Sequence, residues 1–288
     1  MEFVKINHSH KNLVYSALKE NNISWEYCFS CLYVWNKGRT YLYTDDKVAL
    51  LYMDFGKKYI FMPPLMLSSD NVDITTYIDM AYEHAKSKGV SFIMRGFDKD
   101  FAEQYKHKYN FITKRSESDY IYNAKDLIEL AGKKYHSKRN FINRFALKYN
   151  YEFREYTNKD FVTVISLFDK WMSARSEDSI HERDAIIRAL ENHIELELKV
   201  GLLFVDDQLA GFSIVDPGKN GTAHYLFEKA SLEYEGAYQT INYLTSKTFL
   251  YNAKYINRQE DMGIEGLRKS KLSYYPVIIC DKYNIVRD

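Results

Sequence analysis

Apolar and polar positions follow the same order in two parts of the chain. Residues 42–57 and residues 203–219 each contain an apolar run, an Asp-Asp pair, a second apolar run and a Gly-Lys pair, and a third apolar run follows. Short apolar runs between Asp- and Gly-containing turns are typical of antiparallel hairpins, so each part predicts three antiparallel strands. The repeat spans 206 − 45 = 161 residues at the Asp-Asp pairs and 218 − 56 = 162 at the glycines. The sequence therefore predicts an internal duplication.

Helical periodicity follows the three strands in both copies. In the first copy, apolar residues from Ile74 to Ala85 recur at helical spacing and predict a helix over about residues 72–88, which Gly89 ends. The matching helix of the second copy covers about residues 237–252. Each copy then continues with a short strand, a helix and a last strand. Their predicted positions are 91–94, the region of Phe101 and Tyr105, and 120–122 in the first copy, and 254–257, 264–271 and the residues after Pro276 in the second.

A strand and an amphipathic segment precede the three strands in each copy, at Glu2-Phe3 and again at Glu152-Phe153. These pairs lie 152 − 2 = 150 residues apart, so the second copy holds about a dozen extra residues before its strands (161 − 150 = 11). We assign them to an inserted helix over residues 180–196, whose apolar face is formed by Ile186, Ile187, Leu190 and Ile194.

This order of elements predicts a mixed α/β (α+β) sheet in each copy rather than a doubly wound parallel sheet. A chain of 288 residues is long enough for two domains of roughly 130 residues each. The predicted organisation is an N-terminal domain, residues 1–125, a basic helical connector, residues 126–150, and a C-terminal domain, residues 151–288. Two similar domains imply a cleft between them, where we expect the ligand.

Charge and hydropathy limit the classes of partner. The 40 basic and 39 acidic residues give a formal charge of +1, so nucleic acid or a membrane surface would have to be held by a local patch. The longest uncharged stretch, residues 59–69, is too short to span a bilayer, so no transmembrane segment is expected. We expect a soluble, cytoplasmic protein, and a peripheral membrane contact stays open.

Three cysteines, including the pair Cys28 and Cys31, are the candidates for metal or redox chemistry. A zinc site would need a second cysteine pair or nearby histidines, which the sequence does not offer at a suitable spacing. Core packing is therefore favoured for these thiols. Neither a metal nor a cofactor is expected.

The connector carries cations on a helical pattern. They are Lys133, Lys134, His136, Lys138, Arg139, Arg144 and Lys148. On a helical wheel of about 100° per residue, Lys134 and Lys138 fall inside the apolar arc that contains Phe145. A cation on a buried helix face needs a partner. Either these lysines extend to solvent from a frayed first turn, or they face an anionic group in the cleft.

Residues 256–276 are the segment most suited to chemistry. A strand that ends in Asn-Arg-Gln-Glu-Asp, residues 257–261, would place polar side chains at the end of a sheet, where open α/β sheets bind ligands. Gly263 and Gly266 would allow close approach of the backbone, and Arg268 and Lys271 lie one helical turn apart. An exposed loop and a charged surface helix are the alternative interpretation.

These patterns carry a resemblance. The order of elements resembles the acyl-CoA N-acyltransferase fold, and its duplication is similar to that of FemABX-type peptidyltransferases and the soluble domain of phosphatidylglycerol lysyltransferase. Residues 24–35, 132–145 and 257–276 look like the bacterial family grouped with the C-terminal domain of that lysyltransferase, and the last stretch is the most specific. The resemblance implies transfer of an aminoacyl group, usually from aminoacyl-tRNA, to a lipid or peptide acceptor.

One departure bears on the donor. Enzymes of the acyl-CoA fold hold the pyrophosphate on a Q/RxxGxG/A loop at a helix start, where bare amides and the helix dipole attract it. The corresponding residues 233–238 read Glu-Tyr-Glu-Gly-Ala-Tyr, so only Gly236 fits, and Glu233 and Glu235 would repel a diphosphate. In the first copy, residues 67–72 contain no glycine. Coenzyme A is therefore disfavoured in both halves.

The leading hypothesis is an aminoacyl or acyl transferase that uses an aminoacyl-tRNA or another anionic, ester-activated donor. Glu260 and Asp261 are the candidate catalytic residues for accepting a proton, and Tyr225 is the candidate beside the reacting group. The candidate substrate-binding residues are Lys134, Lys138, Arg139, Arg144, Glu228, Arg258, Arg268 and Lys271. Two alternatives remain, an acyl-CoA N-acyltransferase and a non-catalytic ligand-binding protein on the same fold.

Overall fold

The computed structural model describes residues 2–69, 72–173 and 180–287. The chain forms two compact units. The first contains Met1–Asp119, Glu260–Arg268 and Ile279–Asp288, and the second contains Tyr120–Gln259 and Lys269–Ile278. Each unit is built on one mixed sheet.

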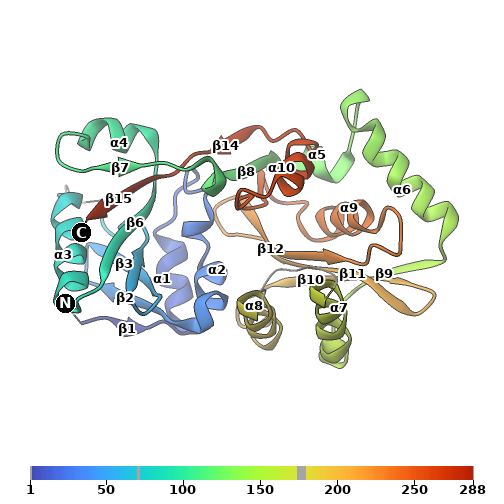
Figure 1. Cartoon of the computed structure of the whole chain (residues 1–288), viewed down its shortest axis with the longest axis horizontal. Coiled ribbons are helices and arrows are strands. Elements are labelled where there is room, and N and C mark those ends of the chain that lie inside the picture. Colours follow the sequence, from blue (N-terminus) through green and yellow to red (C-terminus); the bar gives the residue numbers. More distant parts are fainter. Residues whose placement is uncertain (1, 70–71, 174–179, 288) are drawn as a thin grey trace. The chain divides into compact units, whose positions relative to one another are not determined.

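The sheet of the first unit has the strand order β1-β2-β3-β4-β6-β15-β7, and β5 pairs with β3 (Figure 1). Only β4 and β6 run parallel among the pairs described, because helix α3 connects them. The elements are β1 (Val4–Lys5), α1 (Lys11–Ser16), α2 (Phe29–Val34), β2 (Thr40–Thr44), β3 (Val48–Asp54), β4 (Lys58–Phe61), β5 (Leu65–Met66), α3 (Ile74–Ser87), β6 (Ser91–Phe97), α4 (Lys99–Tyr105), β7 (Phe111–Ile112) and β15 (Tyr283–Arg287).

The core of the first unit lies between α3 and the sheet. Asp73 caps the start of α3 by accepting a hydrogen bond from the Thr75 amide. The apolar face of the helix, with Ile78 and Ala81, packs on Phe61 of β4 and Phe92 of β6. Figure 1 shows α3 on one face of this sheet and α1 and α2 on the other.

The sheet of the second unit has the order β14-β8-β13-β12-β11-β10-β9. The elements are β8 (Asp119–Asn123), α5 (Ala124–Glu129), α6 (His136–Lys148), β9 (Tyr151–Glu155), α7 (Phe161–Ser173), α8 (Ile180–Glu191), β10 (Lys199–Val205), β11 (Gln208–Asp216), β12 (Thr222–Ala230), α9 (Ala237–Phe249), β13 (Tyr255–Asn257), α10 (Glu265–Leu272) and β14 (Ile278–Cys280). Here the parallel pair is β12 and β13, connected by α9.

Helices cover both faces of the second sheet. Figure 1 shows α9 on one face and α7 and α8 on the other. Phe145 of α6 and Ile241 of α9 pack with Leu203, Val205 and Ala210 of the sheet in one buried cluster. The start of α9 is therefore covered by α6.

The structure confirms the two sets of three antiparallel strands, β2-β3-β4 and β10-β11-β12, and the mixed α/β class. The helix expected over residues 72–88 is α3, and two residues just before that range, 70 and 71, lie outside the described part of the chain. The inserted helix expected over residues 180–196 is α8, which ends earlier, at Glu191.

The compact units differ from the expected linear division into residues 1–125, 126–150 and 151–288. The last strand, β15, pairs with β6 and β7 of the first sheet, whereas β8 pairs with β13 of the second. Residues 279–288 consequently belong to the first unit, and residues 120–125 belong to the second. The cleft expected between the halves stays a prediction.

The duplicated glycine turns are alike in conformation but differ in their surroundings. Gly56 and Gly218 have φ of +81° and +73°. Their amides donate to Asp54 Oδ1 at 2.6 Å and to Asp216 Oδ1 at 2.8 Å. A Cβ at Gly218 would lie 1.9 Å from the Thr222 carbonyl oxygen, whereas at Gly56 it would meet no described atom within 4 Å.

Substituting these two glycines gives a matched pair of stability predictions. Gly56→Ala should lower the free energy of unfolding by about 1 kcal/mol, the cost of a left-handed alanine. Gly218→Ala should lower it by about 3 kcal/mol, because the clash adds to that cost. Urea denaturation of both variants measures the difference, and equal losses would show that the contact with Thr222 does not matter.

Candidate functional site

A bend in the chain after β13 forms one wall of the candidate site in the second unit. The strand ends at Asn257, whose Oδ1 accepts a hydrogen bond from the Gln259 amide at 2.6 Å. Gln259 has a φ of +58°, so the chain leaves the sheet here. Lys271 Nζ donates to the carbonyls of Arg258 at 2.6 Å and Gln259 at 3.0 Å. The expected strand continuing to Asp261 is therefore wrong, and Lys271 holds the bend.

Arg258 is buried against one carboxylate and several aromatic rings. Its Nη2 donates to Glu228 Oε1 at 2.8 Å, and the two side chains are 11% and 12% exposed. Glu228 Oε2 also accepts from Asn242 Nδ2 at 2.7 Å. Burial favours the neutral form of Arg258, but Glu228 more than offsets this and raises its pKa. Arg258 therefore stays a cation.

One donor of this guanidinium has no acceptor. Nη1 of Arg258 is buried and makes no hydrogen bond to any residue that the structure describes. Arginine has five N–H donors, and leaving one unsatisfied in a buried position is costly. An orphan donor of this kind marks a place where an anionic or carbonyl oxygen of a ligand would be stabilised.

Lys138 of α6 is also buried in the second unit. Its side chain donates to Ser273 Oγ at 2.6 Å, and its Nζ lies 4.0 Å from the centre of the Tyr274 ring. The Tyr274 ring also stacks under Arg258, at 4.9 Å. Burial, together with the charge of Arg258, lowers the pKa of Lys138 to about 8. Of the two alternatives left open for Lys138, extension to solvent is excluded by its burial, and its observed hydrogen-bond partner is the Ser273 hydroxyl.

Tyr225 contributes to packing around this site. Its hydroxyl donates to the Asn242 carbonyl at 3.0 Å and shares a hydrogen bond with Ser246 Oγ at 2.9 Å, which ties β12 to α9. Burial raises its pKa. Its predicted catalytic role stays a prediction, but its hydroxyl is fully engaged with α9.

The other predicted cations of the second unit lie outside this cluster. Lys134 precedes α6 and pairs with Asp126 at 3.2 Å; its side chain is 46% exposed, which agrees with the alternative in which this lysine extends to solvent. Arg139 donates to the carbonyls of Leu130 and Gly132 at the end of α5. Arg144 is exposed and pairs with Glu235 at 3.4 Å.

Three predicted residues belong to the first unit. Asp261 is fully buried, accepts from the Gly263 amide at 2.8 Å and pairs with Arg268 at 2.7 Å. Glu260 pairs with Arg95 and accepts from Trp25 Nε1 at 3.4 Å. These contacts tie down the loop before α10. The catalytic roles of Glu260 and Asp261 and the binding role of Arg268 stay predictions.

A buried charge cluster in the first unit was not predicted. Lys282 Nζ lies 2.9 Å from Glu26 Oε1 and 2.8 Å from Asp119 Oδ1, and Arg95 pairs with Glu26 at 3.0 Å. The pKa of Glu26 is raised, chiefly by burial and with contributions from Asp119 and Glu260, although Lys282 and Arg95 lower it. The four residues are distant in sequence and none forms a motif, so no local signal identifies them.

In the second unit, the unpredicted participants are Asn242, Ser273 and Tyr274. Tyr274 and Ser273 lie inside the segment 256–276 that the sequence singled out, so their proximity in sequence was the available signal. Asn242 lies on α9, and no motif in the sequence indicated that it belongs to the site. The structure thus brings together five predicted residues, which are Tyr225, Glu228, Arg258, Lys138 and Lys271.

The loop that holds a diphosphate in acyl-CoA enzymes is occupied by the protein itself. Gly236 has a φ of +91°, and a Cβ there would lie 2.8 Å from the Phe141 carbonyl oxygen of α6. The Ala237 amide donates to the Tyr234 carbonyl at 3.1 Å, and Tyr238 accepts from Trp171 Nε1 at 2.7 Å. With α6 packed on the start of α9, this helix end offers no open cradle for phosphate.

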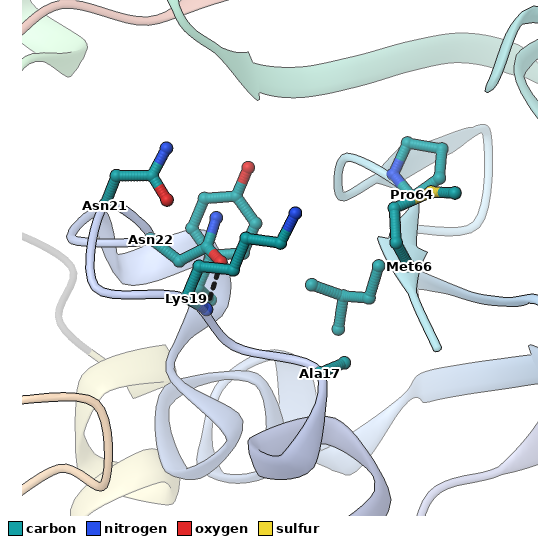
Figure 2. Close-up of a pocket in the computed structure, with 8 residues that line it drawn as sticks. Ala17, Lys19, Asn21, Asn22, Pro64 and Met66 are labelled. Carbon is teal, nitrogen blue, oxygen red and sulfur yellow. Dashed lines mark hydrogen bonds between the residues drawn. The ribbon is translucent and has the colours of Figure 1, made fainter. Parts of the chain in front are cut away.

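A separate cavity of about 160 Å³ lies in the first unit, between the residues after α1 and the strand β5 (Figure 2). Figure 2 shows Lys19, Asn21 and Asn22 on one side and Pro64 and Met66 on the other. Ala17, Tyr27 and Leu65 complete its lining. No residue predicted for the site lines this cavity.

In the described part of the chain, no helix is long and apolar enough to cross a bilayer. Among the same residues, no three His, Cys, Asp or Glu side chains are grouped to hold a metal.

Solved structures show that the chain has the tandem acyltransferase fold. FemX matches with a TM-score of 0.63 at 11% identity, over 100% of this chain and 98% of its own. A tandem GNAT protein of the clavulanic acid pathway matches with a TM-score of 0.56 at 9% identity, over 99% and 98%. At these identities the likeness shows the fold alone.

The chain belongs to the family of phosphatidylglycerol lysyltransferase C-terminal domains, whose model matches residues 21–286. A conserved protein of unknown function from Bacteroides thetaiotaomicron is 29% identical over the full length of both chains, with a TM-score of 0.88. The L-PGS structure from Bacillus licheniformis has a TM-score of 0.64 at 15% identity, over 88% of this chain and 85% of its own. An uncharacterised protein of Mycoplasmoides gallisepticum is 28% identical over 186 residues, which are 63% of this chain and 60% of that protein.

Proposed function

We propose that the protein is an acyltransferase that moves an aminoacyl group from an ester-activated, anionic donor such as aminoacyl-tRNA to an amine or hydroxyl acceptor. The family is named for lysyl transfer to phosphatidylglycerol, and the fold is shared with FemX and with a tandem GNAT protein. Both support a transferase. The candidate site is the cluster of Arg258, Glu228, Lys138 and Lys271 in the second unit.

The orphan Nη1 donor of Arg258 is the observation that carries this proposal. Arg258 is held by one carboxylate, Glu228, and the basic side chains of Lys138 and Lys271 lie in the same cluster. A buried guanidinium with a donor that lacks an acceptor costs free energy unless a ligand oxygen completes the site. A phosphate of the donor, or the oxyanion of a tetrahedral intermediate, would supply that oxygen and accept from Nη1.

An ester donor asks little further of the protein. The leaving group is already activated, so the rate depends on holding the acceptor near the carbonyl carbon and on stabilising the oxyanion. A fixed guanidinium donor, held by Glu228 and stacked on Tyr274, suits the second task because it needs no reorganisation during the reaction.

The occupied loop before α9 supports a donor other than acyl-CoA. We therefore expect no change in melting temperature when acetyl-CoA is added. A ligand at 100 times its dissociation constant stabilises a folded protein by about 2.7 kcal/mol, which a thermal-shift titration readily detects. Saturable stabilisation by acetyl-CoA would instead favour the acyl-CoA N-acyltransferase alternative.

The function is tested with a panel of tRNAs, each charged with one radiolabelled amino acid. The purified chain is incubated with each, together with vesicles that contain phosphatidylglycerol, a pentapeptide or a small amine. Transfer of label to one acceptor class is the expected result. The control variant Lys148→Met removes an exposed cation of α6 outside the cluster, and it should transfer label as the unaltered protein does. Binding of charged tRNA without loss of its ester would favour a non-catalytic binding protein.

A further inference from the structure

We propose that Lys138 accepts the proton of the attacking nucleophile in the transfer step, so that a lysine rather than a carboxylate is the base. This inference rests on the proposed function and assigns a role within the same site. The sequence had suggested Glu260 or Asp261 as proton acceptor and Lys138 as a phosphate ligand. The contacts of Lys138 favour the role of proton acceptor over that of phosphate ligand.

The first reason is that Lys138 lacks a carboxylate partner. Its side chain is 8% exposed, and its hydrogen bond goes to the neutral hydroxyl of Ser273. No carboxylate of the described residues lies within ion-pair distance of its Nζ. A lysine buried in this way is destabilised as a cation and is readily neutral.

The second reason is the charge of its neighbours. Arg258, at the end of β13, faces Lys138 as a second cation and disfavours its protonation. From the segment after α10 it meets Ser273 and the Tyr274 ring, which is uncharged because burial raises the pKa of that phenol. The carboxylate of the cluster, Glu228, is bound to Arg258. Just before α6, Lys134 is paired with Asp126.

Lys282 provides a contrast within the same chain. It is even more deeply buried than Lys138, at 1% exposure, but it lies within 3 Å of both Glu26 and Asp119. Burial lowers its pKa, and the two carboxylates more than reverse this, so its pKa is raised. Of these two buried lysines, Lys282 is kept charged through ion pairs, whereas Lys138 has no ion pair with a residue that the structure describes. Lys138 is therefore the one of the two that is suited to gain and lose a proton.

Lys138 would carry one proton from the acceptor to the leaving group. The acceptor's amine or hydroxyl attacks the ester carbonyl carbon, and its proton moves to the neutral Nζ of Lys138. The tetrahedral intermediate collapses, the bond from carbon to the ester oxygen breaks, and the Lys138 ammonium returns the proton to that leaving oxygen. The products are the acylated acceptor and the free alcohol of the donor, and Lys138 is neutral again.

A pKa of about 8 leaves roughly one tenth of Lys138 neutral at pH 7. An ordinary lysine would be neutral in fewer than about one molecule in a thousand. The transfer rate should therefore rise about fivefold from pH 7 to pH 8, and it should level off above pH 9 at about tenfold the rate at pH 7. If Lys138 instead bound a phosphate of the donor, the transfer rate should fall as the pH rises, because a lysine holds phosphate only as the ammonium.

The test combines two variants with two measurements. Single-turnover transfer and donor affinity are measured between pH 6 and 9.5 for the unaltered protein, Lys138→Met and Lys138→Arg. Separately, the Lys138 amine is titrated by NMR after ¹³C-methylation of the lysines, with Lys138→Arg assigning its signal and the exposed Lys86 as the reference. The NMR titration needs no activity.

The proposal expects an NMR midpoint near pH 8 and a transfer rate that follows it. Both variants should lose about 10²-fold in rate, lose the pH dependence and keep donor affinity within about threefold. An arginine that restores the rate, or a midpoint near pH 10, would overturn the role of Lys138 while leaving the transferase intact. Absence of transfer at every pH in the unaltered protein would refute the proposed function itself.

Discussion

The Lys282→Met variant is expected to lose about 3–5 kcal/mol of unfolding free energy. Lys282 is almost fully buried, and its ammonium lies 2.8 Å from Asp119 and 2.9 Å from Glu26. Methionine fills a similar volume, so the loss comes from the charges left behind. With the ammonium gone, the buried carboxylates of Glu26 and Asp119 lose a cation that they share, although Arg95 still pairs with Glu26.

Urea denaturation checks this value against two controls. Lys86→Met removes an exposed lysine that pairs with Glu83 at 4.0 Å, and it should cost at most about 0.5 kcal/mol. Adding Asp119→Asn to Lys282→Met should recover part of the loss, because one of the two buried negative charges is removed. A loss below about 1 kcal/mol for Lys282→Met would mean that water reaches the cluster and screens it.

The Arg258→Met variant is expected to lose both stability and transfer. Removing the guanidinium leaves Glu228 buried with Asn242 as its hydrogen-bond partner, at a cost of about 3–5 kcal/mol. It also removes the orphan donor proposed to bind the oxyanion, which should lower the transfer rate by about 10²–10³-fold. The two effects have different causes, so they can be separated.

A double variant separates them. Adding Glu228→Gln to Arg258→Met removes the stranded charge, and the glutamine oxygen still accepts from Asn242. The double variant should recover most of the stability, measured by urea denaturation, and none of the transfer rate. If it transferred at the normal rate, Arg258 would be a structural residue and the site would have to be placed elsewhere.

Local patterns predicted much of the fold. The two sets of strands and the helices α3 and α9 depend on alternation and helical spacing, which neighbouring residues determine. The apolar arc of α6 includes Lys138, but the wheel left open whether this lysine is buried or extends to solvent. Lys134 lies before the helix, which begins at His136, so the wheel does not apply to it.

Non-local pairing explains what the sequence could not predict. No periodicity shows that β15 joins the first sheet rather than the second, since either sheet could bury its apolar residues. Lys282, Glu26, Arg95 and Asp119 come from four separate segments and meet only in the folded chain. The positive φ of Gln259 turns the chain away from the sheet before Glu260, and because this residue is not a glycine, the sequence does not indicate the turn.

The most direct test of the central claim is a crystal structure with a donor analogue. Adenosine with an amino acid attached at its 3′ position through an amide mimics the end of a charged tRNA and does not react. We expect its carbonyl oxygen within hydrogen-bond distance of Arg258 Nη1, and its reacting carbon near Lys138 Nζ. An analogue bound only in the cavity beside Lys19 and Met66, with Arg258 Nη1 still unpaired, would contradict this assignment.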